Sequence, residues 1–73
     1  MSNYRQAALD SLYYQAITDR IKAKASLHIL LDHPAGIGDH STEDLHNNLN
    51  EALSNLADAE DRLATLERLK ETM

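Results

Sequence analysis

Hydrophobic residues recur at heptad spacing in two long segments of the chain. In the second segment, steps of four and three residues alternate through Leu45, Leu49, Ala52, Leu56, Ala59, Leu63 and Leu66. In the first segment, the same steps run through Leu9, Tyr13, Ala16, Arg20, Ala23, Leu27 and Leu30. A seam of this kind predicts a helix that packs along its length against another helix.

The segment between the two seams contains every strong helix breaker of the chain. Residues 33–41 hold the one proline, Pro34, and both glycines, Gly36 and Gly38. Proline disfavours helical geometry at the residue before it, and glycine permits the backbone angles of a tight turn. The sequence therefore predicts a helix over about 3–32, a loop over 33–41 and a helix over about 42–71.

The two seams match in length and phase when the chain folds back on itself. Leu30 then lies level with Leu45, and Leu9 lies level with Leu66. Matched seams on either side of a short loop are typical of an αα-hairpin. We expect residues 1–73 to form one all-α domain, an antiparallel two-helix hairpin.

Further apolar residues flank the seams and find no partner within a single hairpin. Contiguous apolar surface usually marks an interface, and a chain this short buries little of its own surface. We therefore expect self-association into a four-helix dimer, or into a larger ring or bundle of hairpins. The predicted oligomer interface comprises Ala7, Tyr14, Ile17, Ile21, Ala25, Leu31, Leu53 and Ala57.

Composition argues against several classes of protein. Twelve acidic residues against seven Lys and Arg give a net charge of -5 and no basic stripe, so we expect no nucleic-acid binding. Asp58 and Arg62 stand at i and i+4, which favours an ion pair on a solvated face over mimicry of DNA phosphates. No apolar run is long enough to span a membrane, and we expect a cytoplasmic protein.

The sequence also gives little support for a catalytic function. The chain has no cysteine, which excludes disulfides and a thiol nucleophile. It has no Gly-Xaa-Ser-Xaa-Gly turn and no convincing pair of catalytic carboxylates. We expect a protein that is not an enzyme and that carries no cofactor.

The loop and part of the second helix resemble a known group of proteins. They carry the runs GIGDH (36–40) and LADAEDRLATL (56–66). The chain resembles a family of very small helical-hairpin proteins of tailed bacteriophages, over most of its length from about Tyr4 to Leu66. Similar chains often have proline after the loop histidine, where this chain has Ser41. The family has no established activity, so the resemblance implies a viral context and supplies no catalytic residues.

One candidate ligand site combines aromatic, cationic and loop residues. Tyrosine rings and cationic side chains between subunits are suited to stack a base and pair a phosphate, and a glycine loop before a helix can hold an anion. The candidate residues are Tyr4, Arg5, Tyr13, Tyr14, Arg20, Lys24, Gly36, Gly38 and Ser41. The simpler interpretation is structural: the tyrosines pack in interfaces, the glycines close the hairpin, and Arg20 covers Leu56 and pairs with Glu60.

Three histidines near the loop form a weak candidate metal site. His33, His40 and His46 stand among Asp and Glu residues, and imidazole and carboxylate suit first-row metals. None of them forms the compact pair that one helical turn would present to a metal. Polar capping of helix ends explains them equally well, and no metal is favoured. pH-dependent assembly is a weaker alternative, because imidazole titrates near neutrality.

Three functions remain open on this sequence. The leading hypothesis is a phage-type accessory protein that is a homo-oligomer and binds or inhibits a host protein in the host cytoplasm. The alternative is an oligomeric protein that sequesters a small anionic ligand, such as a signalling nucleotide, as a counter-defence. A further alternative is a minor structural or assembly component of the virion.

Overall fold

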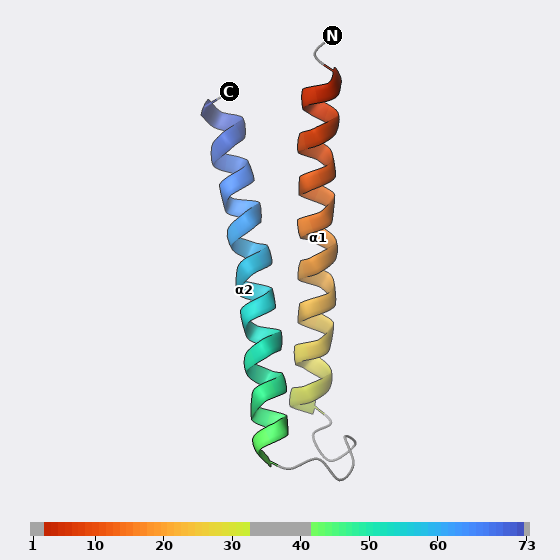
Figure 1. Ribbon diagram of the computed structural model, residues 1–73, viewed down its shortest axis with the longest axis vertical. Helices are drawn as coiled ribbons and strands as arrows, with labels where there is room; N and C mark the ends of the chain where they lie inside the picture. Colours follow the sequence, from red (N-terminus) through yellow and green to blue (C-terminus); the bar gives the residue numbers. More distant parts are fainter. Residues whose placement is uncertain (1–2, 33–41, 73) are drawn as a thin grey trace.

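The computed structural model describes residues 3–32 and 42–72, which form two long helices. Helix α1 spans Asn3–Asp32 and helix α2 spans Thr42–Thr72. They run antiparallel and side by side, with both chain termini at the same end of the molecule (Figure 1). The hairpin measures 56 × 17 × 15 Å. The all-α helical hairpin expected from the sequence is confirmed.

The two helices differ in how well their ends are stabilised. α2 has Glu43 and Asp44 in its first turn and Lys70 in its last turn. These charges oppose the partial charges of the helix ends and favour the helix. α1 has no acidic residue in its first turn and no basic residue in its last turn. Its helicity therefore depends more heavily on packing against α2.

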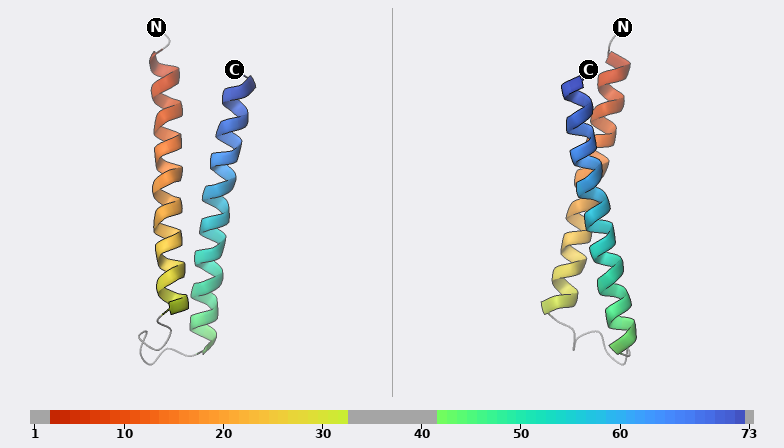
Figure 2. Two further views of the ribbon diagram at one scale, coloured as in Figure 1. Left: turned by 180° about the vertical axis from the view of Figure 1, so that it is seen from behind. Right: turned by 90° about the vertical axis from the view of Figure 1, so that its left-hand side faces the viewer.

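The core of the hairpin is the pair of heptad seams. Every seam position is buried or half-buried, as the spacing predicts. Figure 2 shows the two helices crossing near the middle of their length. Among the described residues, the buried ones are Ala16, Ala23, Ala52, Ala59 and Leu66. Four of these five residues are alanines, so the helices approach closely but bury little apolar surface between them.

The seam divides the surface of the hairpin into two flanks, because successive helical residues turn by about 100°. Residues directly before a seam position lie on one flank, which we call the groove face; Leu12, Asp19, Asp58 and Arg62 belong to it. Residues directly after a seam position lie on the other flank, which we call the back face. In an antiparallel pair, the corresponding flanks of both helices share one side of the molecule. The hairpin therefore presents two distinct surfaces.

The ion pair expected between Arg20 and Glu60 does not form. Arg20 is half-buried in the seam, as expected. Within residues 3–32 and 42–72, however, the ion pair that joins the helices links Arg62 to Asp19. The physical reason is position: Asp19 and Arg62 both border the groove face, whereas Glu60 lies on the back face.

Candidate functional site

Arg62 lies at the centre of the groove face and contacts both helices. Its Nη2 atom lies 2.7 Å from Oδ2 of Asp19 on α1, and its Nε atom lies 3.0 Å from Oδ2 of Asp58 on α2. Gln15 donates a hydrogen bond of 3.0 Å from Nε2 to Oδ1 of Asp19. The pair of Asp58 and Arg62 is the one that their i, i+4 spacing predicts. This network fixes the two helices to one another at the surface.

The charges of this network reinforce each other. The hydrogen bond from Arg62 holds the pKa of Asp19 below its ordinary value of 3.8, and the hydrogen bond from Gln15 lowers it further, against the opposing effect of desolvation. The bond to Asp19 in turn raises the pKa of Arg62. Both groups are therefore charged at neutral pH, and the cation of Arg62 is satisfied within the hairpin.

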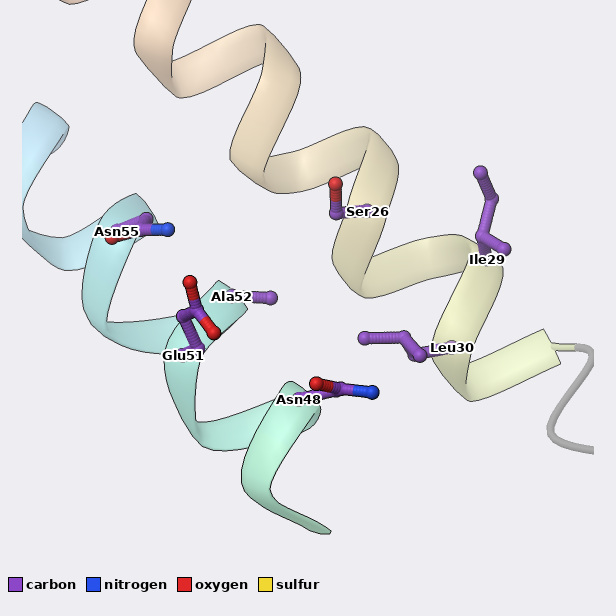
Figure 3. A pocket seen from close by; sticks show the side chains of 7 residues that line it. All are labelled: Ser26, Ile29, Leu30, Asn48, Glu51, Ala52 and Asn55. Carbon is purple, nitrogen blue, oxygen red and sulfur yellow. The ribbon is translucent and has the colours of Figure 1, made fainter. Parts of the chain in front are cut away.

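Three open hollows follow the groove face along the hairpin. The hollow nearest the loop end has a volume of about 340 Å³ and is shown in Figure 3, where Leu30 of α1 and Ala52 of α2 point toward one another. The second, of about 350 Å³, lies beside Asp19 and Arg62. These two hollows are lined by a mixture of polar and apolar side chains, so they offer no continuous apolar surface.

The third hollow, near the chain termini, is the most apolar. It has a volume of about 450 Å³ and is formed in part by Leu12, Leu66 and Leu69. Leu12 is 57% exposed and Leu69 is 43% exposed. Asp58 and Asp61 border the same hollow. The groove face thus combines an apolar floor with acidic edges at this end, and we call this place the terminal hollow.

Two tyrosines and a lysine form an aromatic cluster across the two helices. The rings of Tyr13 and Tyr14 meet edge to face, with centroids 5.4 Å apart and an interplanar angle of 80°. The Nζ atom of Lys70 on α2 lies 5.0 Å from the centroid of the Tyr13 ring. Tyr13 is half-buried in the seam, whereas Tyr14 is 64% exposed. The exposed ring of Tyr14 therefore lies against Tyr13, and Tyr13 in turn contacts the cation.

The other residues of the candidate ligand site are dispersed within one hairpin. Tyr4 is 84% exposed near the start of α1, and Arg5 beside it is exposed as well. Gly36, Gly38 and Ser41 lie outside the described residues. Among the described members of the set, the hairpin brings the rings of Tyr13 and Tyr14 together.

The apolar residues predicted to form an oligomer interface are largely uncovered. Tyr14, Ile21, Leu31 and Leu53 are between 55% and 64% exposed. Ile17 is half-buried, and the alanines at positions 7, 25 and 57 are exposed. These side chains are not packed within the hairpin.

Neither a metal cluster nor a membrane span is found in the described part of the chain. Of the three candidate histidines, His33 and His40 lie outside the described residues and His46 is exposed. Residues 3–32 and 42–72 contain no group of three or more potential ligands placed to hold a metal ion. Neither described helix has an apolar stretch long enough to cross a membrane.

The sequence analysis identified Asp58 and Arg62 but not the other residues that shape the groove face. Leu12, Asp19 and Leu69 escaped notice because a seam is identified from its apolar members. The signal that identifies them is their place in the heptad: each directly precedes a seam position or its continuation. Comparison of the chain with protein-family models, curated proteins and solved structures found no match.

Proposed function

We propose that this chain is a non-enzymatic binding protein of the phage type, which works as a homo-oligomer of hairpins and engages a host protein in the host cytoplasm. The observation that carries the proposal is the surplus of exposed apolar side chains: Leu12, Tyr14, Ile21 and Leu53 are each more than half exposed. Apolar surface of this kind is typical of protein interfaces. The proposal rests on this surface together with the acidic charge of the chain.

The terminal hollow is the place on the groove face that suits a partner protein. Its floor of Leu12, Leu66 and Leu69 can accept the apolar side chains of an amphipathic helix. Its acidic edge, Asp58 and Asp61, favours a partner with basic residues beside those apolar ones. The charge of Arg62 does not oppose such a partner, because two carboxylates already compensate it. The partner we propose is therefore a basic amphipathic helix on a host protein.

A capture experiment with matched variants tests this function. Purified chain on a support is exposed to host lysate at physiological salt, and each captured protein is then purified and its direct binding measured. We expect a specific partner that Leu12→Glu no longer binds, because a carboxylate replaces part of the apolar floor. Thr18→Glu is the matched control, since it adds the same charge at an exposed position outside the groove. Equal binding by both variants, or an empty capture, would contradict the proposal.

A second candidate function has a specific observation in its favour. The exposed ring of Tyr14 stands against Tyr13, whose other neighbour is the cation of Lys70. Aromatic faces and ammonium groups are suited to hold a nucleotide base and its phosphate. Together with Arg20 and Lys24 from the same helix, such a cluster between subunits would sequester a small anionic ligand, such as a signalling nucleotide.

Thermal denaturation with and without nucleotides separates the two functions. Sequestration predicts that a linear or cyclic nucleotide raises the melting temperature, since a ligand that binds only the folded state stabilises it. Tyr14→Ala and Lys24→Ala should abolish the shift, whereas Lys22→Ala, an equivalent change on the groove face, should retain it. A melting curve that no nucleotide moves would eliminate sequestration and leave the host-protein function in place.

A further inference from the structure

The back face carries several large apolar side chains that are exposed to solvent. Tyr14, Ile21, Leu31 and Leu53 are exposed on it, and Ile17 and Ala57 lie between them at the midpoints of the two helices. On the groove face, by contrast, the network of Asp19, Arg62 and Asp58 separates the exposed leucines from Ile29. The back face therefore offers a large apolar area that is not divided by an ion-pair network.

The surface area of the hairpin indicates that a second copy covers this face. The chain has a mass of 8.2 kDa and exposes 5703 Å². A compact monomer of that mass exposes about 4,500 Å², and a compact particle of twice the mass exposes about 7,500 Å². Two separate hairpins exceed the latter value by roughly 3,900 Å², within the range of obligate homodimer interfaces. Dimerisation can thus supply the burial that the alanine core lacks.

The charges of the back face are sorted along its length. In the half near the termini, Asp10, Glu60 and Glu67 are acidic and exposed. In the half near the loop, Lys24 is exposed and forms no ion pair with any described residue, and Glu43 lies at the far end of α2. A parallel arrangement of two copies would place the acidic halves against each other, and like charges in contact are unfavourable. An antiparallel arrangement places the acidic half of each copy against Lys24 of the other.

The axial positions of these residues fit the antiparallel arrangement. Lys24 lies about 10 Å from the midpoint of α1 toward the loop, at 1.5 Å per residue. Asp10 lies about 11 Å from the midpoint of the same helix toward the termini. A two-fold axis through the middle of the back face, perpendicular to the helices, places α1 opposite α1 of the other copy and therefore brings Lys24 level with Asp10 of that copy.

We propose that two copies of the chain pack antiparallel through their back faces into a four-helix bundle, with Lys24 of each copy paired to Asp10 of the other. This inference rests on the homo-oligomer of the proposed function and specifies its interface and its direction. It leaves the groove faces of both copies exposed on the outside of the bundle. Each dimer thus presents two terminal hollows, one at either end.

Charge reversal tests the pairing across the interface. Lys24→Glu should weaken dimerisation at least about tenfold, measured by analytical ultracentrifugation, and Asp10→Lys added to the same chain should restore it. Lys22→Glu is the matched control, because it makes the same change on the groove face and should leave the dimer intact. In a parallel dimer, residue 24 of each copy would lie level with residue 24 of the other. Lys24→Glu would then replace repulsion between two lysines with repulsion between two glutamates. No rescue by the second change would overturn the proposal.

The apolar part of the interface has its own pair of variants. Ile21→Glu should give a monomer at concentrations where the unchanged chain is a dimer, whereas Thr18→Glu, one turn away and off the back face, should remain a dimer. Dissociation by Leu12→Glu but not by Ile21→Glu would place the interface on the groove face and overturn the proposal. If Ile21→Glu fails to fold, the charge-reversal pair still decides the question.

Distances between spin labels decide the direction of the two copies. The chain has no cysteine, so Asn47→Cys provides a single exposed labelling site on α2. In the antiparallel dimer, the two labels are offset along the bundle by about 30 Å, and in a parallel dimer this offset vanishes. A short distance or a monomeric protein would overturn the inference. Failure of host-protein capture by an antiparallel dimer would overturn the proposed host function alone.

Discussion

The alanine layers of the seam predict an unusual sensitivity to larger side chains. Ala16 and Ala59 are both 0% exposed and lie level with one another in the seam. Ala59→Leu inserts three additional carbon atoms at a seam position that is fully buried between the two helices. Overpacking of a filled core typically destabilises a protein by about 1–3 kcal/mol. Ala16, the residue opposite, is already the smaller partner and cannot move aside to make room. We therefore expect a loss toward the upper part of that range.

Urea denaturation followed by circular dichroism measures this effect. With a slope of about 1 kcal/mol per molar urea for a chain of this size, the midpoint of Ala59→Leu should fall by about 2–3 M. Ala8→Leu is the matched control, since Ala8 is exposed and the change should stay within about 0.5 kcal/mol. Both variants are compared at equal protein concentrations, because assembly contributes to stability. An unchanged midpoint for Ala59→Leu would refute the close approach of the helices at this layer.

Three further predictions concern charged residues of the hairpin. Arg62 lowers the pKa of Asp19, so the ionised Asp19 carboxylate stabilises the fold above the ordinary value of 3.8, and this stabilisation is lost as pH falls through the lowered value. The stability of Asp19→Asn, measured by urea denaturation, should therefore decline less in acid than that of the unchanged chain. Lys70→Gln removes a cation from the ring of Tyr13 and should lower the melting temperature by about 2–4 °C, and an unchanged melting curve would contradict this contact. Arg20→Leu places an apolar side chain at a half-buried seam position and should raise stability by about 1 kcal/mol in urea denaturation; a lower midpoint would show that Arg20 has a stabilising partner.

The heptad pattern predicted the core of the fold because backbone geometry alone determines it. A residue at a seam position faces the other helix whatever its neighbours are, so even Arg20 is half-buried there. The number of residues between the seams and the turn chemistry of Pro34 and the glycines were sufficient to predict antiparallel folding. The same argument extends to the exposed residues directly after the seam, such as Ile21 and Leu53.

The surface contacts could not be predicted in this way. Arg62 reaches Asp19 across the groove, and Lys70 reaches the ring of Tyr13 across the seam. Both contacts depend on the rotamers of long side chains, each of which has several partners within reach. The sequence analysis paired Arg20 with Glu60 on spacing alone, whereas the outcome is determined by which flank of the helix each charge occupies.

The alanine core and the exposed back face are two consequences of one composition. Alanine stabilises each helix by its intrinsic propensity and allows a close approach, but each buried methyl group contributes only about 0.8 kcal/mol. A hairpin whose buried residues are four alanines and Leu66 therefore gains little from its own seam. Other large apolar side chains, Ile21 and Leu53 among them, lie outside that seam and are more than half exposed. The proposed dimer would couple folding of the hairpin to assembly, so we expect its stability to rise with protein concentration, as mass action requires.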